Sequence, residues 1–70
     1  MEKMTIRELR RAREFSQESM AELLGVHVNT YRGYEEHPER IPISKAAEIA
    51  KILDVDMSRI IFLPRKSTVM

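Results

Sequence analysis

The sequence contains no cysteine and no tryptophan, and only two glycines and three prolines. Without cysteine, neither a disulfide nor a thiolate-bound metal can stabilise the fold, which must depend on an apolar core. The sequence also has no signal-type apolar segment at its start and no run of about 18 apolar residues, so we expect a cytoplasmic protein without a membrane span. Its 70 residues are enough for one small domain.

An excess of charge of one sign is missing as well. The sequence has 12 Lys and Arg residues against 11 Asp and Glu residues, which gives a formal net charge of +1. A larger basic excess is typical of strong nucleic-acid binders. Four arginines nevertheless lie close together, at Arg7, Arg10, Arg11 and Arg13. They either form a solvated helix face with nearby glutamates or border a phosphate backbone.

The hydrophobic pattern indicates helices and no strands. The predicted helices cover residues 6–13, 17–24, 28–36, 45–53 and 57–63. Their predicted N-terminal caps are Thr5, Ser16, His27, Ser44 and Asp56. The pattern turns Met20, Ala21, Leu23 and Leu24 inward in the second helix, and Ala46, Ala47, Ile49, Ala50, Ile52 and Leu53 in the fourth.

Helix-breaking residues lie between these segments. Gly25 is expected to end the second helix in the left-handed conformation. Pro38 and Pro42 bracket residues 37–43, where we expect a loop. The domain is predicted to cover residues 1–63, and residues 64–70 are predicted to form a tail.

The third predicted helix has an outer face that is unusual for a core helix. Val28, Asn29, Arg32 and Gly33 share one side of it. This mixture is too varied for a coiled coil and too poor in charge for a solvated surface. We interpret it as a contact surface, held by the preceding helix across the turn at Gly25, as in a helix-turn-helix.

The stretch SQESMAELLGVHVNTYRGYEE, residues 16–36, resembles the helix-turn-helix of the lambda repressor/Cro family, also called the XRE family. The resemblance extends over residues 5–63 and includes Ser16-Gln17-Glu18, Ala21, Leu24-Gly25-Val26, Thr30, Tyr34-Glu35, Pro42 and the segment AEIAKILDV. It implies a compact, all-α fold of five helices. It also implies a transcription regulator, in the manner of a repressor, that binds specific double-stranded DNA with residues 28–36 in the major groove.

The resemblance also implies which residues reach the bases. By family position these are Val28, Asn29 and Arg32. Asn29 can pair with adenine and Arg32 with guanine, while the methyl groups of Val28 can contact the methyl group of thymine. Gly33 either allows close approach of the DNA or is simply tolerated in the helix.

Other family positions point to the DNA backbone and to a structural ion pair. Gln17, Arg40 and Lys45 are expected to contact phosphates, with Gln17 at a helix N-terminus that favours an anion. Arg10 and Glu35 occupy positions at which family members often form a partly buried ion pair, and the alternative is two exposed charges.

Two residues depart from the family pattern, which usually has Asn-Gly after Tyr34-Glu35. Glu36 and His37 stand there instead, and an acid near the DNA backbone repels phosphate. The sequence offers no catalytic, cofactor or metal site. His27 and His37 are its only histidines, and their spacing from the glutamates fits no zinc pattern, so we expect neither an enzyme nor a metal.

A single domain of this kind covers half a DNA site, so we expect a weak homodimer on a palindromic operator, encoded by a phage, a prophage or another mobile element. The expected interface is a C-terminal helix containing Ile60, Ile61, Phe62 and Leu63, although these residues could instead complete the core. The alternative function is a protein-interaction module, an antitoxin-like or adaptor domain that keeps the fold without strong DNA binding.

Overall fold

The computed structural model describes residues 3–63. This part contains the α-helices α1 (Ile6–Ala12), α2 (Gln17–Leu24), α3 (Val28–Glu36) and α4 (Ile43–Leu53), and the 3₁₀ turns η1 (Pro38–Arg40) and η2 (Met57–Arg59). The predicted all-α fold is therefore confirmed. None of the described helices is long and apolar enough to cross a membrane. The predicted tail, residues 64–70, lies outside the described residues.

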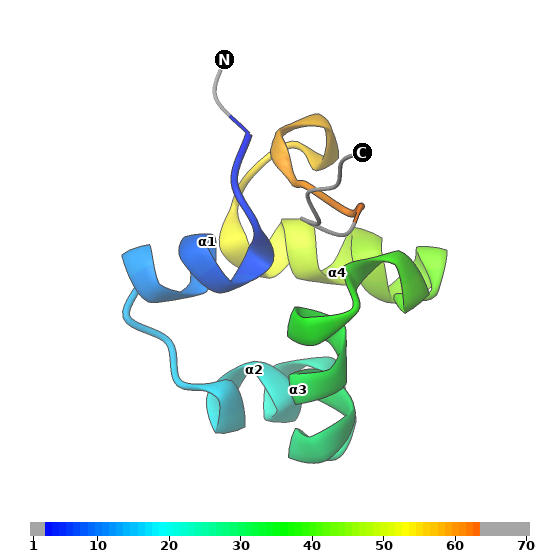
Figure 1. The fold of residues 1–70 in the computed structure, drawn as a ribbon. Coiled ribbons are helices and arrows are strands. Elements are labelled where there is room, and N and C mark those ends of the chain that lie inside the picture. Colours follow the sequence, from blue (N-terminus) through cyan, green and yellow to red (C-terminus); the bar gives the residue numbers. More distant parts are fainter. Residues whose placement is uncertain (1–2, 64–70) are drawn as a thin grey trace.

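The helices form two groups that face each other across the core. α2 and α3 pack together at one end of the molecule, opposite the segments 3–5 and 57–63 (Figure 1). α4 contacts both α1 and α2, so it joins the helix-turn-helix pair to the rest of the domain. The core contains Ile6, Leu9, Met20, Ala21, Leu24, Tyr31, Ile49, Ala50, Leu53 and Ile60.

Three residues predicted to face inward do not belong to the fully buried core. Leu23 is 57% exposed, Ala47 is exposed, and Ile52 is only partly buried. Each helix buries a narrow stripe, centred near Leu24 in α2. Because successive residues are about 100° apart around a helix, Leu23 lies well to one side of that stripe. The prediction was therefore wrong for Leu23 and Ala47.

The helix caps follow from local chemistry. The Thr5 hydroxyl accepts from the Glu8 amide while the Glu8 carboxylate accepts from the Thr5 amide, at 3.1 and 2.9 Å. Ser16 accepts from the Ser19 amide at 2.9 Å, as predicted. These bonds satisfy amides that the first turn of a helix leaves without a partner. The predicted caps at His27 and Asp56 also accept backbone amides, from Asn29 and Ser58.

The predicted cap at Ser44 is wrong, because α4 begins at Ile43 and Pro42 occupies the cap position. The proline ring fixes φ of Pro42 at −60°, a value that also suits a helix, while its ψ of 147° is extended. The Pro42 carbonyl accepts a hydrogen bond from the Ala46 amide at 2.8 Å. The predicted loop over residues 37–43 contains the turn η1, for which Pro38 supplies the first residue. Pro38 suits this position because it has no amide hydrogen to leave unsatisfied.

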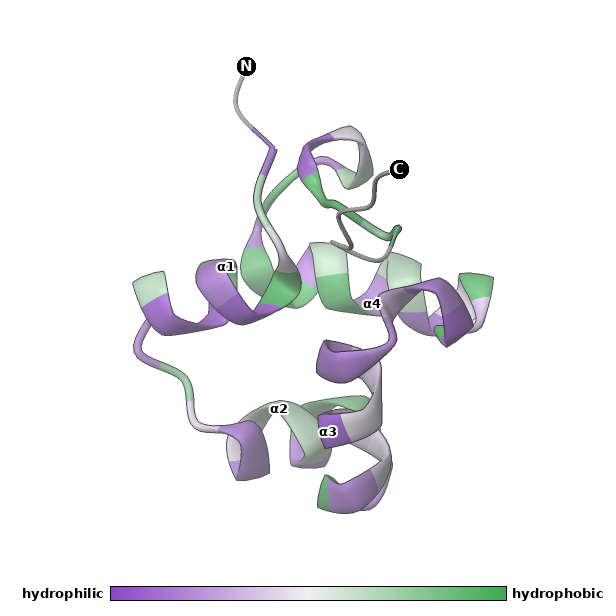
Figure 2. Ribbon diagram, viewed as in Figure 1, coloured by the Kyte–Doolittle hydropathy of each residue, from purple (hydrophilic) through white to green (hydrophobic). Residues whose placement is uncertain are grey.

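The predicted fifth helix is also wrong. Only Met57–Arg59 form a 3₁₀ turn, and the backbone at Ile60 is already extended. Met4 pairs with Ile60 in a parallel bridge, in which the Met4 amide donates to Arg59 at 3.0 Å and the Ile61 amide donates to Met4 at 2.9 Å. β-branched isoleucines favour this extended form. Residues 60–63 are all hydrophobic, and the segment that follows η2 is green in Figure 2.

Candidate nucleic-acid interface

The turn between α2 and α3 fixes how α3 is presented. Gly25 has φ of 71° and ψ of 33°, which is the left-handed region that glycine tolerates best. The Val26 amide then donates back to the Ala21 carbonyl at 3.0 Å, closing the end of α2. The Tyr31 side chain is fully buried on the inner face of α3 and meets Tyr34 edge to face, with ring centroids 6.3 Å apart. The outer face of α3 is therefore held outward by the core.

Asn29 and Arg32 form a joined polar pair on this outer face. Both residues are exposed, and Arg32 Nη1 donates to Asn29 Oδ1 at 2.9 Å. The Glu18 carboxylate lies 3.7 Å from Arg32 Nη2, across the gap to α2. The two predicted base-reading groups are thus adjacent and mutually oriented.

Behind this face lies an ion pair buried between α1 and α3. Arg10 Nε is 2.6 Å from Glu35 Oε2, and the side chains of Arg10 and Glu35 are 10% and 0% exposed. Arg10 Nη1 also donates to the Phe15 carbonyl at 2.8 Å. Burial alone raises the pKa of the Glu35 carboxyl, but hydrogen bonds from Arg10, Gln17 and Arg7 outweigh it and hold the pKa below the ordinary value.

The side chain of Gln17 connects the buried ion pair to the exposed arginine. Gln17 Nε2 donates to Glu35 Oε1 at 2.9 Å, and Gln17 Oε1 accepts from Arg32 Nε at 3.1 Å. Gln17 was expected to contact phosphate. In the structure its amide already has a partner at each end.

The remaining predicted contact residues differ in whether their side chains are exposed and in whether they already have a hydrogen-bond partner. Val28 is half-buried and packs against the core, while Arg40 is exposed at the end of η1. Lys45 Nζ donates to the Leu24 carbonyl at 2.8 Å, so it stabilises the last turn of α2. A Cβ at Gly33 would meet nothing within 4 Å, so packing within the domain gives no reason for a glycine there.

A helix-turn-helix family model matches residues 6–60, which includes α1 to α4 and both 3₁₀ turns. The chain belongs to the lambda repressor/Cro-like, or XRE, family of helix-turn-helix domains. A curated relative is described as an uncharacterized HTH-type transcriptional regulator, YobD, of Bacillus subtilis (strain 168). It is 33% identical over 58 residues, which cover 83% of this chain and 52% of YobD. The chain therefore spans about half the length of this relative. No solved structure matches significantly.

In this helix-turn-helix domain, sequence reasoning missed a third partner of the buried carboxylate. Arg7 Nε lies 3.2 Å from Glu35 Oε1, with the Arg7 side chain 44% exposed. Arg7 and Arg10 are one helical turn apart, a spacing that places two arginines on the same face of a helix. That spacing was the signal in the sequence, although it does not identify the carboxylate that the arginines share.

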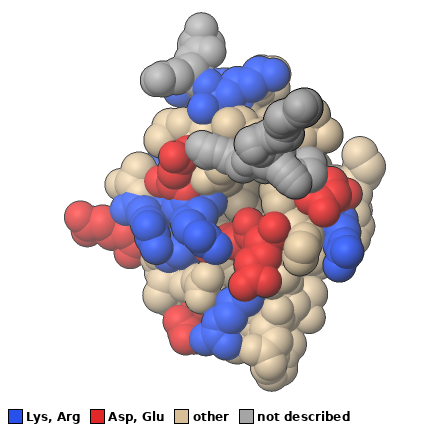
Figure 3. Space-filling view, viewed as in Figure 1, with Lys and Arg blue, Asp and Glu red and all other residues tan. Residues whose placement is uncertain are grey.

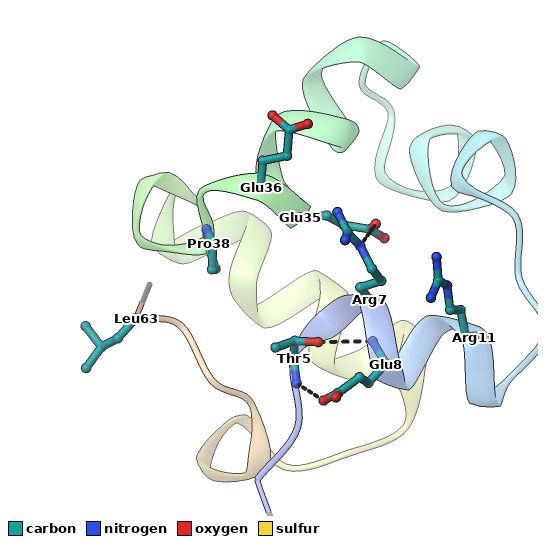
Figure 4. A pocket seen from close by; sticks show the side chains of 8 residues that line it. All are labelled: Thr5, Arg7, Glu8, Arg11, Glu35, Glu36, Pro38 and Leu63. Carbon is teal, nitrogen blue, oxygen red and sulfur yellow. Dashed lines mark hydrogen bonds and ion pairs between the residues drawn. The ribbon is translucent and has the colours of Figure 1, made fainter. Parts of the chain in front are cut away.

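Arg7 also lines a pocket of about 390 Å³ between α1, the end of α3 and η1 (Figure 4). Arg11 and the acids Glu8 and Glu36 share its wall, so the pocket has mixed charge. Figure 3 likewise shows acidic and basic side chains interspersed, with no continuous basic surface on the face in view. Within residues 3–63, no cluster of His, Asp and Glu could hold a metal ion.

Proposed function

We propose that this domain is a transcription regulator that binds specific double-stranded DNA, with α3 in the major groove. Membership of the helix-turn-helix family and the description of YobD as a transcriptional regulator support a DNA-binding regulator. The observation that carries the finer proposal is the exposed Asn29–Arg32 pair on α3, held outward by the buried face of the same helix. Amide and guanidinium groups are the side chains that read adenine and guanine in the major groove.

The contacts with the DNA backbone are few in this proposal. Arg40 is exposed and close to the end of α3, whereas Lys45 is engaged with the carbonyl of Leu24. Glu36 is exposed at the end of α3, where its negative charge would repel a nearby DNA phosphate. We therefore propose modest affinity, with base contacts contributing much of the specificity.

We further propose that the domain acts as a weak homodimer on a palindromic operator and represses transcription there. Leu63 is 72% exposed and Ile43 is 79% exposed. Both line an apolar groove of about 380 Å³ together with Met57 and Phe62. A two-fold contact through this groove would have to set the two α3 helices one DNA turn apart, about 34 Å, as readers of two half-sites require.

The direct test of this function is selection of bound duplexes from genomic fragments, followed by footprinting. We expect one enriched, palindromic sequence. With roughly six phosphates neutralised per dimer, log K against log salt concentration should have a slope of about −5. If no sequence is enriched, or the selected duplex binds without salt dependence, DNA recognition is excluded and a protein-interaction module becomes the better explanation.

Variants of α3 and of the loop after it should act differently on the selected duplex. Asn29→Ala and Arg32→Ala should each reduce discrimination by about 1–3 kcal/mol at particular base pairs. Arg40→Ala should instead weaken binding almost equally on all sequences, because a phosphate contact carries no base information. The measurement is competition between the selected duplex and its single-base variants, and similar profiles for the three variants would exclude α3 as the reading helix.

A further inference from the structure

We infer that Gln17 is a positioning residue for Arg32, so that base recognition depends on a hydrogen-bond chain that begins at the buried carboxylate of Glu35. This inference rests on the proposed function. In this hydrogen-bond chain, Gln17 Nε2 donates to Glu35 Oε1 at 2.9 Å, and Gln17 Oε1 accepts from Arg32 Nε at 3.1 Å. These two hydrogen bonds connect the buried core of the domain to the exposed outer face of α3.

The Glu35 carboxylate, which anchors the hydrogen-bond chain, is held firmly in place. The Glu35 side chain is 0% exposed and accepts hydrogen bonds from Arg10 and Arg7 as well as from Gln17. A carboxylate with several charged donors in a buried site has little freedom to rotate. Whatever is bonded to it is therefore held at a fixed place relative to α1 and α3.

The two partners of Gln17 determine which kind of side chain can link them. Glu35 can only accept hydrogen bonds and Arg32 can only donate them. The side chain between them must donate at one end and accept at the other, which an amide does with two separate atoms. A carboxylate at position 17 would repel Glu35, and an ammonium would repel Arg32. The orientation of the Gln17 amide is therefore set by its partners.

The held guanidinium of Arg32 keeps N–H groups that make no hydrogen bond within the domain. Arg32 uses Nε on Gln17 and one N–H of Nη1 on Asn29. Glu18 forms an ion pair with Nη2 at 3.7 Å, which is too long for a hydrogen bond and is exposed to water. One N–H on Nη1 and two on Nη2 make no hydrogen bond, so they are the groups left to donate to the acceptors of guanine. Holding these groups before DNA arrives lowers the ordering cost of binding.

The consequence is a signature that a phosphate contact does not produce. Without the Gln17 amide, Arg32 keeps its contacts with Asn29 and Glu18 but loses the bond that holds Nε, so its guanidinium is held less firmly. Discrimination should therefore fall at the base pair that Arg32 reads and stay unchanged elsewhere. A phosphate contact by Gln17 would instead give an equal loss on every duplex. The variant Gln17→Met separates these cases, since it keeps the length of the side chain and removes both hydrogen-bonding groups.

The first arm of the test uses the free protein and needs no DNA. In ¹⁵N NMR spectra we expect the Arg32 Nε–H to exchange with water at least about threefold faster in Gln17→Met than in wild type, with the Arg10 Nε–H unchanged. As the reciprocal test, Arg32→Ala is an exposed change that leaves the core intact, and it should shift the side-chain amide signals of Gln17. If neither variant changes its partner's signal, the inference is wrong even if the protein binds DNA.

The second arm measures competition between the selected duplex and its single-base variants. We expect Gln17→Met to reduce discrimination roughly tenfold at the base pair read by Arg32, and the double variant Gln17→Met/Arg32→Ala to lose no more than Arg32→Ala alone. Arg40→Ala is the control for a uniform loss. A uniform loss in Gln17→Met would overturn the positioning role. Failure of wild type to select any duplex would instead refute the proposed function, while the NMR arm would still decide the Gln17–Arg32 contact.

Discussion

Replacement of Glu35 by alanine is expected to lower the free energy of unfolding by about 3–5 kcal/mol, because it leaves a buried guanidinium without a counter-charge. The Arg10 side chain is only 10% exposed and would keep the Phe15 carbonyl as its acceptor. Domains of this size have a total stability on the order of 5 kcal/mol. Urea titration followed by circular dichroism should therefore find at most about 2 kcal/mol of stability left in Glu35→Ala, so that it unfolds at low urea concentration or is already partly unfolded without denaturant.

Matched variants separate this effect from the loss of any glutamate at the end of α3. Glu36→Ala changes the next residue, which is exposed, and should alter stability by less than about 0.5 kcal/mol. The double variant Arg10→Met/Glu35→Leu should recover much of the loss, since it removes both buried charges. A loss of less than about 1 kcal/mol in Glu35→Ala would show that the ion pair is not important for stability.

Acid titration of the wild-type protein checks the same ion pair. The pKa of Glu35 is lower in the folded state than its ordinary value near 4.5. Such a carboxylate stabilises the fold fully above its unfolded-state pKa, and this contribution is lost as the pH falls through the folded-state pKa. The double variant Arg10→Met/Glu35→Leu lacks the group and should lose less stability over that acid range.

The parts of the fold that were predictable are those fixed by neighbouring residues. The caps at Thr5 and Ser16 and the left-handed turn at Gly25 each involve bonds within a few residues, so the sequence contains all their partners. The segment after Met57 depends instead on pairing between Met4 and Ile60, from the two ends of the described region. Helical periodicity alone could not reveal that an extended partner was available, and this is why a fifth helix was predicted.

In the candidate site, too, the roles of single residues were predictable from the sequence, whereas the contacts between them were not. Family position assigned roles to Gln17, Asn29 and Arg32 one residue at a time. Their mutual bonds, and the bond from Gln17 to Glu35, depend on how α2 packs against α3, which no local pattern contains. Lys45 is the clearest example of what the sequence could not show. It was predicted to contact a phosphate, but in the fold the Leu24 carbonyl lies close enough to accept a hydrogen bond from it.

The hydrophobic residues 60–63 differ in how well they can test the proposed dimer. Ile60 is buried in the core, so a substitution there would disturb the fold itself, and the Ile61 side chain is only partly exposed. Leu63 is 72% exposed and lines the apolar groove, so its side chain can be changed with little effect on the core. It is therefore the better position at which to separate association from stability.

Leu63→Gln is expected to reduce affinity for a palindromic duplex roughly 100-fold. A two-fold interface contains each residue twice, so the substitution removes two leucines from it. With about 1.5 kcal/mol for each buried side chain, the loss is about 3 kcal/mol, which corresponds to that change in affinity. The measurement is analytical ultracentrifugation with the palindrome, in which wild type should bind as a pair and the variant should bind mainly as single copies.

Two controls test whether the loss comes from association rather than from DNA contact. On a duplex carrying one half-site, Leu63→Gln and wild type should bind equally, because a single copy makes no dimer contact. Leu23→Gln changes the exposed leucine of α2 in the same neutral way and should leave pairing on the palindrome intact. If Leu63→Gln pairs on the palindrome as cooperatively as wild type does, the contact between copies must lie outside the groove formed by Ile43, Met57, Phe62 and Leu63.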